Sequence, residues 1–296
     1  MPVLLLLSPS PLAGKTTVAA GLAEVACAHG GAADLERLPG DEHAEADAAL
    51  FASLARASGD ASEEVRIIEA PAGDPQASVG SNPDARALVV ADGSSPLPDT
   101  LEYCGAVGDR FAGLVINKTP PKRIERLRAE AQAAGVSLLA VLPEDRLLAA
   151  PVLRDVATAL SATAEHFTNG TGLHPLDRPV IATISADPGQ AHFARYDASA
   201  VIVRSDKPDL QLAALNAGAT CLILTGGLPI LSYVLERAEE DEIPLLRTGL
   251  DTISTVGAIE ALFAAKPFSG GEAKVKRIAS LLAEIDADAL GLTAKS

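Results

Sequence analysis

The amino-terminal segment constrains the fold of this chain most strongly. An apolar run at 3–7 is followed by a loop that ends in Gly14-Lys15-Thr16, and a helical pattern of apolar residues continues from there. A strand, a loop and a helix in this order are typical of a phosphate-binding loop. The N–H groups and the dipole at the start of the helix both favour a negative charge at that point. We therefore expect an α/β fold with an anion site at the end of its first strand.

Five residues of this segment form the first part of a predicted nucleotide site. The Lys15 ammonium is expected to reach the β- and γ-phosphates of ATP, and the Thr16 hydroxyl to hold Mg²⁺. The loop departs from the usual pattern, because Pro9 stands where the first glycine is expected and Gly14 is its only glycine. The sequence is compatible both with a loop that binds phosphate and with a degenerate loop that has lost this ability. The residues predicted to contact nucleotide are Ser8, Gly14, Lys15, Thr16 and Thr17.

Two acidic residues and one amide are further candidates for this site. Glu69 closes the apolar run 65–69, and a carboxylate at the end of a neighbouring strand can bind Mg²⁺ directly or through water. Asp47 is a second predicted metal ligand, although the helix dipole explains an acidic residue near a helix start equally well. Asn117 follows the run 113–116, and its amide can pair with an adenine edge. Glu69 can also be an ordinary strand-end acid and Asn117 a turn residue, so both interpretations are kept.

Composition excludes several classes of function. The chain has 296 residues, of which 48% are hydrophobic but only 3% aromatic, so its core must be aliphatic. A formal net charge of −15 argues against a general nucleic-acid surface or a surface for anionic membranes. The three cysteines and five histidines show no metal-ligand spacing, which argues against zinc and favours a reducing compartment. The apolar start is too short for a signal peptide or a membrane span, and we expect a cytoplasmic protein.

Short aliphatic runs alternate with helical stretches along the chain. This alternation predicts a doubly wound, mostly parallel α/β sheet whose site lies at the carboxyl ends of the strands. The Gly-, Thr- and Pro-rich stretch 167–179 interrupts both periodicities and is interpreted as a linker. The predicted parts are a nucleotide-binding domain at 1–166, this linker, a smaller α/β domain at 180–265 and a helix at 266–296. The strands expected in the first domain are 3–7, 65–69, 87–91, 113–116 and 138–142.

The second half of the chain shows the same alternation. Strands are expected at 180–185, 199–204, 219–224 and 244–247, and helices at 208–217, 230–240 and 252–263. The loops that follow the expected strands 199–204 and 219–224 each precede a helix, and together they could bind an anion or a nucleotide. A pair of glycines after a strand is also common in simple turns, so these loops can equally be turns that bind no ligand. The predicted effector-binding residues are Asp206, Lys207, Thr225, Gly226 and Gly227.

The carboxyl-terminal segment carries an apolar stripe at helical spacing. The stripe packs either on its own domain or on a protein partner. Its members are Val275, Ile278, Leu282, Ile285 and Ala289.

These motifs together carry a resemblance to known proteins. The first half resembles the dethiobiotin-synthetase-like branch of the P-loop enzymes, in the segments 8–16, the strand ending at Glu69, 87–93, 113–117 and 142–151. The second half resembles a DRTGG domain, in the segments 203–214, 221–227 and 251–255. The pair is similar to the N-terminal regulatory part of long phosphotransacetylases over nearly all of residues 1–265.

The resemblance implies a nucleotide-binding role for particular residues. It implies that Lys15, Thr16 and Glu69 bind Mg-nucleotide and that Asn117 faces the base. Leu12 departs from the family pattern, because an inner glycine is expected there. In the second half, Asp-Lys at 206–207 replaces the namesake Asp-Arg.

Three functions follow as hypotheses. The first is a stand-alone regulatory or nucleotide-sensing protein, a homodimer with ATP and Mg²⁺ at the first domain and a small effector at the second. The second is an ATP-dependent synthetase or ligase of the dethiobiotin synthetase or cobyrinate amidation type, with phosphoryl-transfer or ATPase activity. Such an enzyme needs a lysine after the second strand, whereas the segment 34–41 is acidic and offers only Arg37. The third is a degenerate scaffold that binds partners through its tail helix.

Overall fold

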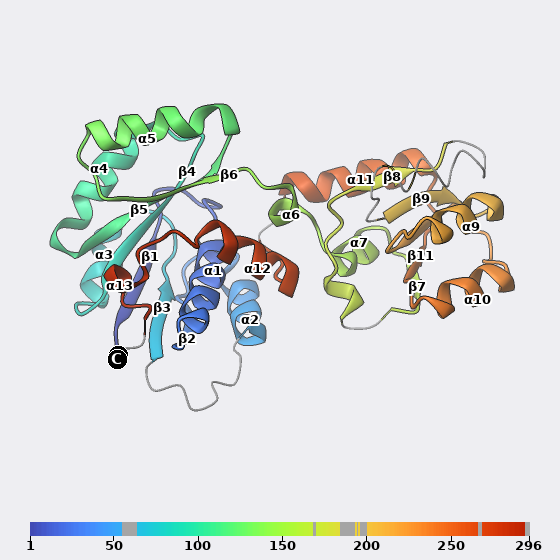
Figure 1. Ribbon diagram of the computed structural model, residues 1–296, viewed down its shortest axis with the longest axis horizontal. Helices are drawn as coiled ribbons and strands as arrows, with labels where there is room; N and C mark the ends of the chain where they lie inside the picture. Colours follow the sequence, from blue (N-terminus) through green and yellow to red (C-terminus); the bar gives the residue numbers. More distant parts are fainter. Residues whose placement is uncertain are drawn as a thin grey trace. The chain divides into compact units, whose positions relative to one another are not determined.

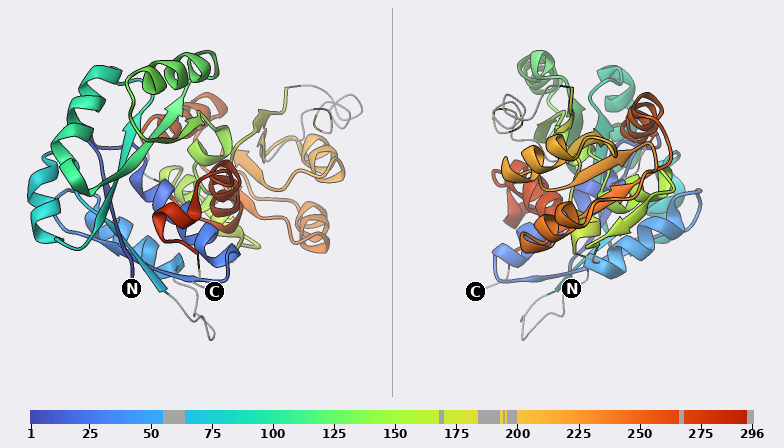
Figure 2. Two further views of the ribbon diagram at one scale, coloured as in Figure 1. Left: turned by 60° about the vertical axis from the view of Figure 1, so that its left-hand side comes forward. Right: turned by 90° about the vertical axis from the view of Figure 1, so that its right-hand side faces the viewer.

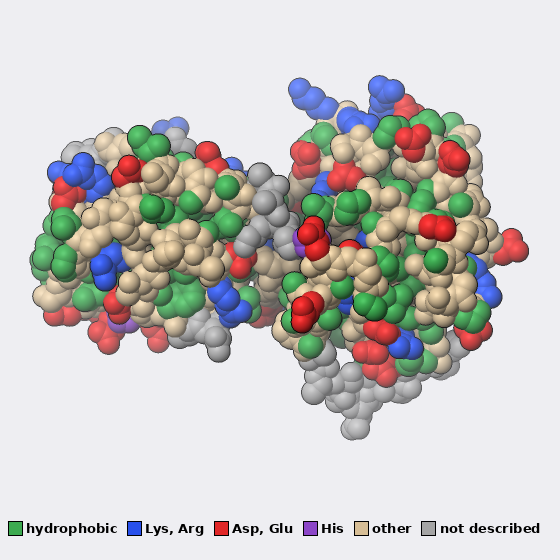
Figure 3. All heavy atoms as spheres, turned by 180° about the vertical axis from the view of Figure 1, so that it is seen from behind, with side chains coloured by type: hydrophobic (Ala, Val, Ile, Leu, Met, Phe, Trp, Pro, Cys, Tyr) green, Lys and Arg blue, Asp and Glu red, His purple; other side chains and the backbone are tan. Residues whose placement is uncertain are grey.

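The structure is a computed structural model that describes residues 1–54, 64–167, 170–183, 193, 195, 200–265 and 268–293. The chain forms two compact units. Unit 1 comprises residues 1–148 and 272–296, and unit 2 comprises residues 149–271. Within the described ranges, no helix is both long and apolar enough to cross a bilayer. Acidic, basic and apolar side chains are interspersed over the face shown in Figure 3.

Unit 1 is built on a parallel sheet of six strands (Figure 1). Their order across the sheet is β2-β3-β1-β4-β5-β6, so the first strand of the chain lies in the interior of the sheet. The strands are β1 (Val3–Leu7), β2 (Ala32–Arg37), β3 (Glu64–Glu69), β4 (Arg86–Asp92), β5 (Phe111–Thr119) and β6 (Leu138–Pro143). This architecture confirms the predicted doubly wound α/β fold class.

Helices cover both faces of this sheet, with α1, α2 and α12 on one face and α3, α4 and α5 on the other. Their bounds are α1 (Lys15–Ala28), α2 (Ala44–Leu54), α3 (Pro75–Ser81), α4 (Leu97–Val107), α5 (Ile124–Ala133), α6 (Arg146–Ala149), α12 (Glu272–Leu281) and α13 (Ala287–Leu290). Two short 3₁₀ helices, η1 (Gly108–Arg110) and η2 (Pro121–Arg123), lie in the connections.

The leucine run of β1 is explained by burial on both sides. Leu4 and Leu6 pack in the cluster that includes α1, whereas Leu5 and Leu7 pack in the cluster that includes α4. Successive side chains of a strand point to opposite faces, so a strand covered on both faces is apolar at every position. The continuous apolar run of β1 is therefore explained by its place in the interior of this sheet.

The carboxyl-terminal segment belongs to unit 1 and is interrupted. The helix α12 ends at Leu281, and a turn separates it from α13. Ile278 and Leu282 are buried against α1, so these members of the predicted stripe pack within unit 1. The break changes the helical phase, and Ala289 is exposed while Leu290 is buried. Arg86 donates a hydrogen bond to the carbonyl of Ala289, which fixes α13 beside the sheet (Figure 2).

Unit 2 is a second, smaller α/β unit. Its five-stranded sheet has the order β7-β11-β10-β9-β8, and β7 alone among these strands runs antiparallel to its neighbour. The strands are β7 (Thr163–Glu165), β8 (Pro179–Ile181), β9 (Ala200–Arg204), β10 (Leu222–Thr225) and β11 (Leu245–Arg247). The helical elements are α7 (Leu153–Ala159), η3 (Thr171–Leu173), α9 (Pro208–Asn216), α10 (Ser232–Glu240) and α11 (Thr252–Ala265).

The division of the chain differs from the predicted domain boundaries at 166 and 180. Unit 2 begins at Ala149, because β7 pairs with β11 and Thr248 donates a hydrogen bond of 2.8 Å to the carbonyl of Leu160. The expected linker 167–179 contains η3 and the buried Leu176. Residues 168–169 of that linker, 184–185 of one expected strand and 199 of another lie outside the described residues.

Candidate functional site

The strand order of unit 1 brings the predicted site residues to one edge of the sheet. Leu6 of β1 is in register with Glu69 of β3, and Asp92 of β4 is in register with Asn117 of β5. All of these strands are parallel, so their carboxyl ends meet at the same edge. The loop of residues 8–14, which we call loop 8–14, begins at this edge and leads into α1.

Loop 8–14 ends in a backbone conformation that favours glycine. Gly14 has a φ of 92° and immediately precedes α1, and as the N-cap residue it offers no side chain to cap that helix start. Leu12 also has a positive φ, of 57°, and its side chain is exposed. The uncapped N–H groups of a first helical turn are donors that need an acceptor. The loop therefore presents donors at the place where the sequence predicts phosphate.

Two residues at the end of β5 hold the loop in place. The Asn117 side-chain amide donates a hydrogen bond of 3.0 Å to the carbonyl of Ala13, and the Lys118 ammonium donates one of 2.6 Å to the carbonyl of Leu12. A Cβ placed on Gly14 would collide with the Asn117 amide nitrogen. In the structure Asn117 thus braces the loop with its donor, and its predicted contact with an adenine edge stays a prediction.

Lys15 and Thr16 both point to the end of β3. The Lys15 side chain is only 5% exposed, and its Nζ donates a hydrogen bond of 2.8 Å to Ser8 Oγ. The same Nζ lies 4.0 Å from Glu69 Oε1. Thr16 Oγ1 donates a hydrogen bond of 3.2 Å to that carboxylate oxygen. Burial lowers the pKa of Lys15, because desolvation disfavours its charged form. Thr17 is buried in the same first turn of α1.

Glu69 is a buried carboxylate, and one of its oxygens has no hydrogen-bond partner among the described residues. The residue is 3% exposed, and this oxygen is Oε2. Burial raises the pKa of Glu69 to about 7, although the charges of Lys15 and Arg37 oppose this shift. A buried, unpartnered carboxylate oxygen is costly, and a bound cation or donor would relieve that cost.

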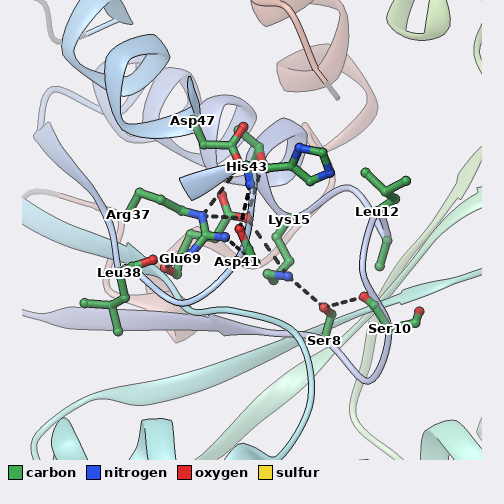
Figure 4. Close-up of polar contacts among 12 residues, drawn as sticks. Ser8, Ser10, Leu12, Lys15, Arg37, Leu38, Asp41, His43, Asp47 and Glu69 are labelled. Carbon is green, nitrogen blue, oxygen red and sulfur yellow. Dashed lines mark hydrogen bonds and ion pairs between the residues drawn. The ribbon is translucent and has the colours of Figure 1, made fainter. Parts of the chain in front are cut away.

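Arg37, at the end of β2, lies at the centre of the polar cluster in Figure 4. Its Nε is 3.6 Å from Asp47 Oδ2 and 3.6 Å from Glu69 Oε1. Its terminal nitrogens pair with the carboxylate of Asp41 and donate to the carbonyl of Leu38. The structure therefore brings the two predicted acidic metal ligands together through a guanidinium. The sequence gives only a weak indication that Arg37 belongs to this site. Arg37 ends the strand β2, and β2 lacks the apolar run that marks the other strands of the site.

The donor set at this edge fits Mg²⁺ only in part. Among the described residues, no group of three or more His, Cys, Asp or Glu side chains is arranged to hold a metal ion. Mg²⁺ usually takes one or two carboxylates and completes its shell with water and phosphate. The Thr16 hydroxyl and the Glu69 carboxylate, with its unpartnered oxygen, meet that requirement. Asp47 faces Arg37 and is a less direct candidate.

The predicted effector residues of unit 2 also lie at one edge of a sheet. The Ser205 N–H donates to the carbonyl of Thr225 at 2.9 Å, which joins the loop after β9 to the end of β10. Asp206 is exposed and accepts two hydrogen bonds from Arg204, which lower the pKa of its carboxyl. The Lys207 backbone precedes α9. The structure therefore places the predicted 206–207 segment, in the loop after β9, next to Thr225 at the end of β10.

The two glycines after β10 connect to the loop after β11. The Gly226 N–H donates to the carbonyl of Leu250 at 2.8 Å, and Arg247 donates to the carbonyl of Gly227 at 3.2 Å. Large apolar side chains that no sequence pattern singles out are exposed on and beside these loops. They are Leu228, Leu231, Tyr233, Leu250 and Ile253.

The chain is thus a two-unit α/β protein with one polar cluster at a strand-end edge and a loop cluster in its second unit. Residues 155–262 match the DRTGG domain family. A solved structure of the CBS and DRTGG domains of the regulatory region of a Clostridium perfringens pyrophosphatase, complexed with its activator diadenosine tetraphosphate, is also similar. It has 14% sequence identity and a TM-score of 0.35, and the match covers 60% of this chain and 76% of that chain. This likeness is weak, and the ligand of that protein is not carried over to this chain.

Proposed function

We propose that this chain is a nucleotide-binding regulatory protein that binds ATP with Mg²⁺ at loop 8–14. The observation that carries the proposal is the convergence of Lys15 and Thr16 on the buried carboxylate of Glu69. Two cationic or donor groups at a helix start, next to a strand-end acid, are the arrangement expected for Mg-nucleotide. The DRTGG match of residues 155–262 supports a regulatory second unit.

The atypical loop is compatible with phosphate. Pro9 and Pro11 lack N–H groups, but the N–H groups at Gly14 and at the first turn of α1 are retained. The Lys15 ammonium donates to a neutral hydroxyl, that of Ser8. A phosphate oxygen is a stronger acceptor, because hydrogen bonds between charged groups are about twice as strong as neutral ones. Nucleotide would therefore attract Lys15 away from Ser8.

In this proposal Thr16 and Glu69 would hold the metal ion, which would neutralise phosphate charge. Lys15 would orient the terminal phosphates, and the bracing of the loop by Asn117 would fix the backbone donors. The side chain of Leu12, which replaces the inner glycine of the motif, is exposed.

A regulatory role is favoured over an ATP-dependent synthetase. A synthetase needs a cation that can receive an anionic acceptor beside the phosphates. The only candidate from the sequence is Arg37, and its guanidinium already faces the carboxylates of Asp41, Asp47 and Glu69. These carboxylates would repel an anionic acceptor. The homodimer, the cytoplasmic location and a small effector at residues 206–207 and 225–227 belong to the same proposal.

Calorimetric titration with ATP and Mg²⁺ tests the nucleotide site. We expect micromolar binding by the wild-type protein and a loss of about tenfold to hundredfold in Lys15→Ala, because a hydrogen bond to a charged group contributes about 1.5–3 kcal/mol. Lys122→Ala is the matched control, since Lys122 is an exposed lysine on η2, and it should bind like wild type. Absence of heat and of a thermal shift with wild-type protein at millimolar ATP would refute the proposal.

A further inference from the structure

The polar cluster at the end of β3 has an unusual charge balance. It contains two cations, Lys15 and Arg37, and three carboxylates, Asp41, Asp47 and Glu69. The Arg37 side chain is 1% exposed, and those of Asp47 and Glu69 are 6% and 4% exposed. Buried carboxylates require a counter-ion, because their ionised forms are strongly disfavoured away from water. Arg37 supplies that counter-ion from within the chain.

Two atoms in this cluster nevertheless lack hydrogen bonds. Arg37 Nε and Glu69 Oε2 are both buried without a hydrogen-bond partner. Arg37 Nε lies 3.6 Å from a carboxylate oxygen of Asp47 and 3.6 Å from one of Glu69, beyond ordinary hydrogen-bond length. The guanidinium is instead anchored at its far end, where it contacts Asp41 and the carbonyl of Leu38 (Figure 4). Arg37 also donates a hydrogen bond of 3.5 Å to the backbone carbonyl of Glu69, but its hold on the Glu69 carboxylate is electrostatic and has no hydrogen bond among the described residues.

We infer that Arg37 competes with a divalent cation for the carboxylates of Glu69 and Asp47. This inference rests on the metal part of the proposed function. The charge of Arg37 offsets part of the charge of these carboxylates, and a second cation beside the guanidinium is repelled. The metal ion then binds well only together with the phosphate charge of a nucleotide. Arg37 is a positioning residue that makes metal binding dependent on nucleotide.

Removal of the guanidinium should therefore open a metal site in the absence of nucleotide. We expect Arg37→Gln to bind Mn²⁺ alone at least about tenfold more tightly than wild type, because Asp47 and Glu69 lose the positive charge that lies between them. The free Mn²⁺ concentration is measured by electron paramagnetic resonance, at the same pH for every variant. Mn²⁺ should also raise the melting temperature of Arg37→Gln more than that of wild type.

Two further variants separate charge from structure. Arg37→Lys keeps a positive charge at the site and should bind Mn²⁺ nearly as weakly as wild type. Arg66→Gln is the matched control, since Arg66 lies on β3 and pairs with Glu36 at the half-exposed surface. It should leave Mn²⁺ binding unchanged. Equal Mn²⁺ affinity in Arg37→Gln and wild type would overturn the inference, and so would equal tightening in Arg37→Lys or Arg66→Gln.

The experiment gives a result even if Arg37→Gln is unstable. A variant that does not fold without metal should regain the wild-type circular dichroism spectrum when Mn²⁺ is added, and failure to do so overturns the inference. The nucleotide titration is independent. A wild-type protein that binds no ATP refutes the proposed function, whereas tightened Mn²⁺ binding by Arg37→Gln would still establish the competition.

Discussion

Gly14 is the residue at which backbone conformation and packing both exclude a side chain. Its φ of 92° lies in the left-handed region, which costs other L-residues about 1–2 kcal/mol. A Cβ at this position would also collide with the amide nitrogen of Asn117, which braces the loop by its bond to Ala13. Pro9, which replaces the first glycine of the motif, does not have a positive φ. The one glycine retained in loop 8–14 is thus the one that the structure requires.

Gly14→Ala should destabilise the protein and weaken nucleotide binding. The matched control is Gly30→Ala, since Gly30 has a φ of 78° but a Cβ added there would meet no heavy atom within 4 Å. That control should lose only about 1–2 kcal/mol of unfolding free energy, the cost of the left-handed backbone. We expect Gly14→Ala to lose about 1–3 kcal/mol more, the usual cost of inserting a methyl group where there is no space for it. Urea unfolding measures both values, and equal losses in the two variants would show that Asn117 does not press on the loop.

The residues of the candidate site differ in how well the sequence predicts them. Lys15 and Thr16 follow from the spacing of a short motif, and Glu69 follows from its place at the end of an apolar run. Arg37 could not be assigned a contact in this way, because its partners Asp47 and Glu69 come from separate elements. Only the order of β2, β3 and β1 in the sheet brings them together.

At the scale of elements, the contact between α1 and α12 ties the two ends of the chain together. Gly21 lies in the middle of α1, where a Cβ would come within 2.7 Å of Ile278 and 2.8 Å of Leu282. Glycine costs about 1 kcal/mol relative to alanine inside a helix. Its presence here is explained by the close approach of α12, which buries Ile278 completely.

A double-mutant cycle tests this packing. Ile278→Ala should cost about 2–5 kcal/mol of unfolding free energy, because it leaves a cavity in the core. Adding Gly21→Ala to that variant fills part of the space and removes a helix-interior glycine. We expect the double variant to be more stable than the sum of the single changes by about 0.5–3 kcal/mol. Strict additivity, measured by denaturant unfolding, would contradict a direct contact between these positions.

Strands with an apolar run could be predicted from the sequence, whereas the strands β2 and β7 and the break after α12 could not. The run 3–7 is apolar at every position because both faces of β1 are covered. The edge strand β2 reads Ala-Ala-Asp-Leu-Glu-Arg, and half of its side chains are polar. The strand β7 has only three residues and forms by pairing with β11. The break after α12 depends on how α13 meets the sheet. The spacing of apolar residues within the segment does not predict such a contact.

At the scale of the molecule, the order of segments in the chain does not match the division into units. Residues 272–296 follow unit 2 in the sequence but pack in unit 1. The stretch 167–179 is rich in turn residues, and this composition predicts a boundary at 166. Composition of this kind marks irregular backbone, whether it lies between units or inside one. The buried Leu176 shows that this stretch is part of unit 2.

Each unit has its own two-sided apolar core, and this predicts that the units unfold separately. In calorimetry we expect two thermal transitions. Ile223→Ala should lower only the transition of unit 2, because Ile223 is fully buried in that core. Mg-ATP should raise only the other transition, by about 2.7 kcal/mol of unfolding free energy at 100 times the dissociation constant. Lys15→Ala should abolish that shift. A single transition displaced by both Ile223→Ala and Mg-ATP would instead require that the two units unfold together.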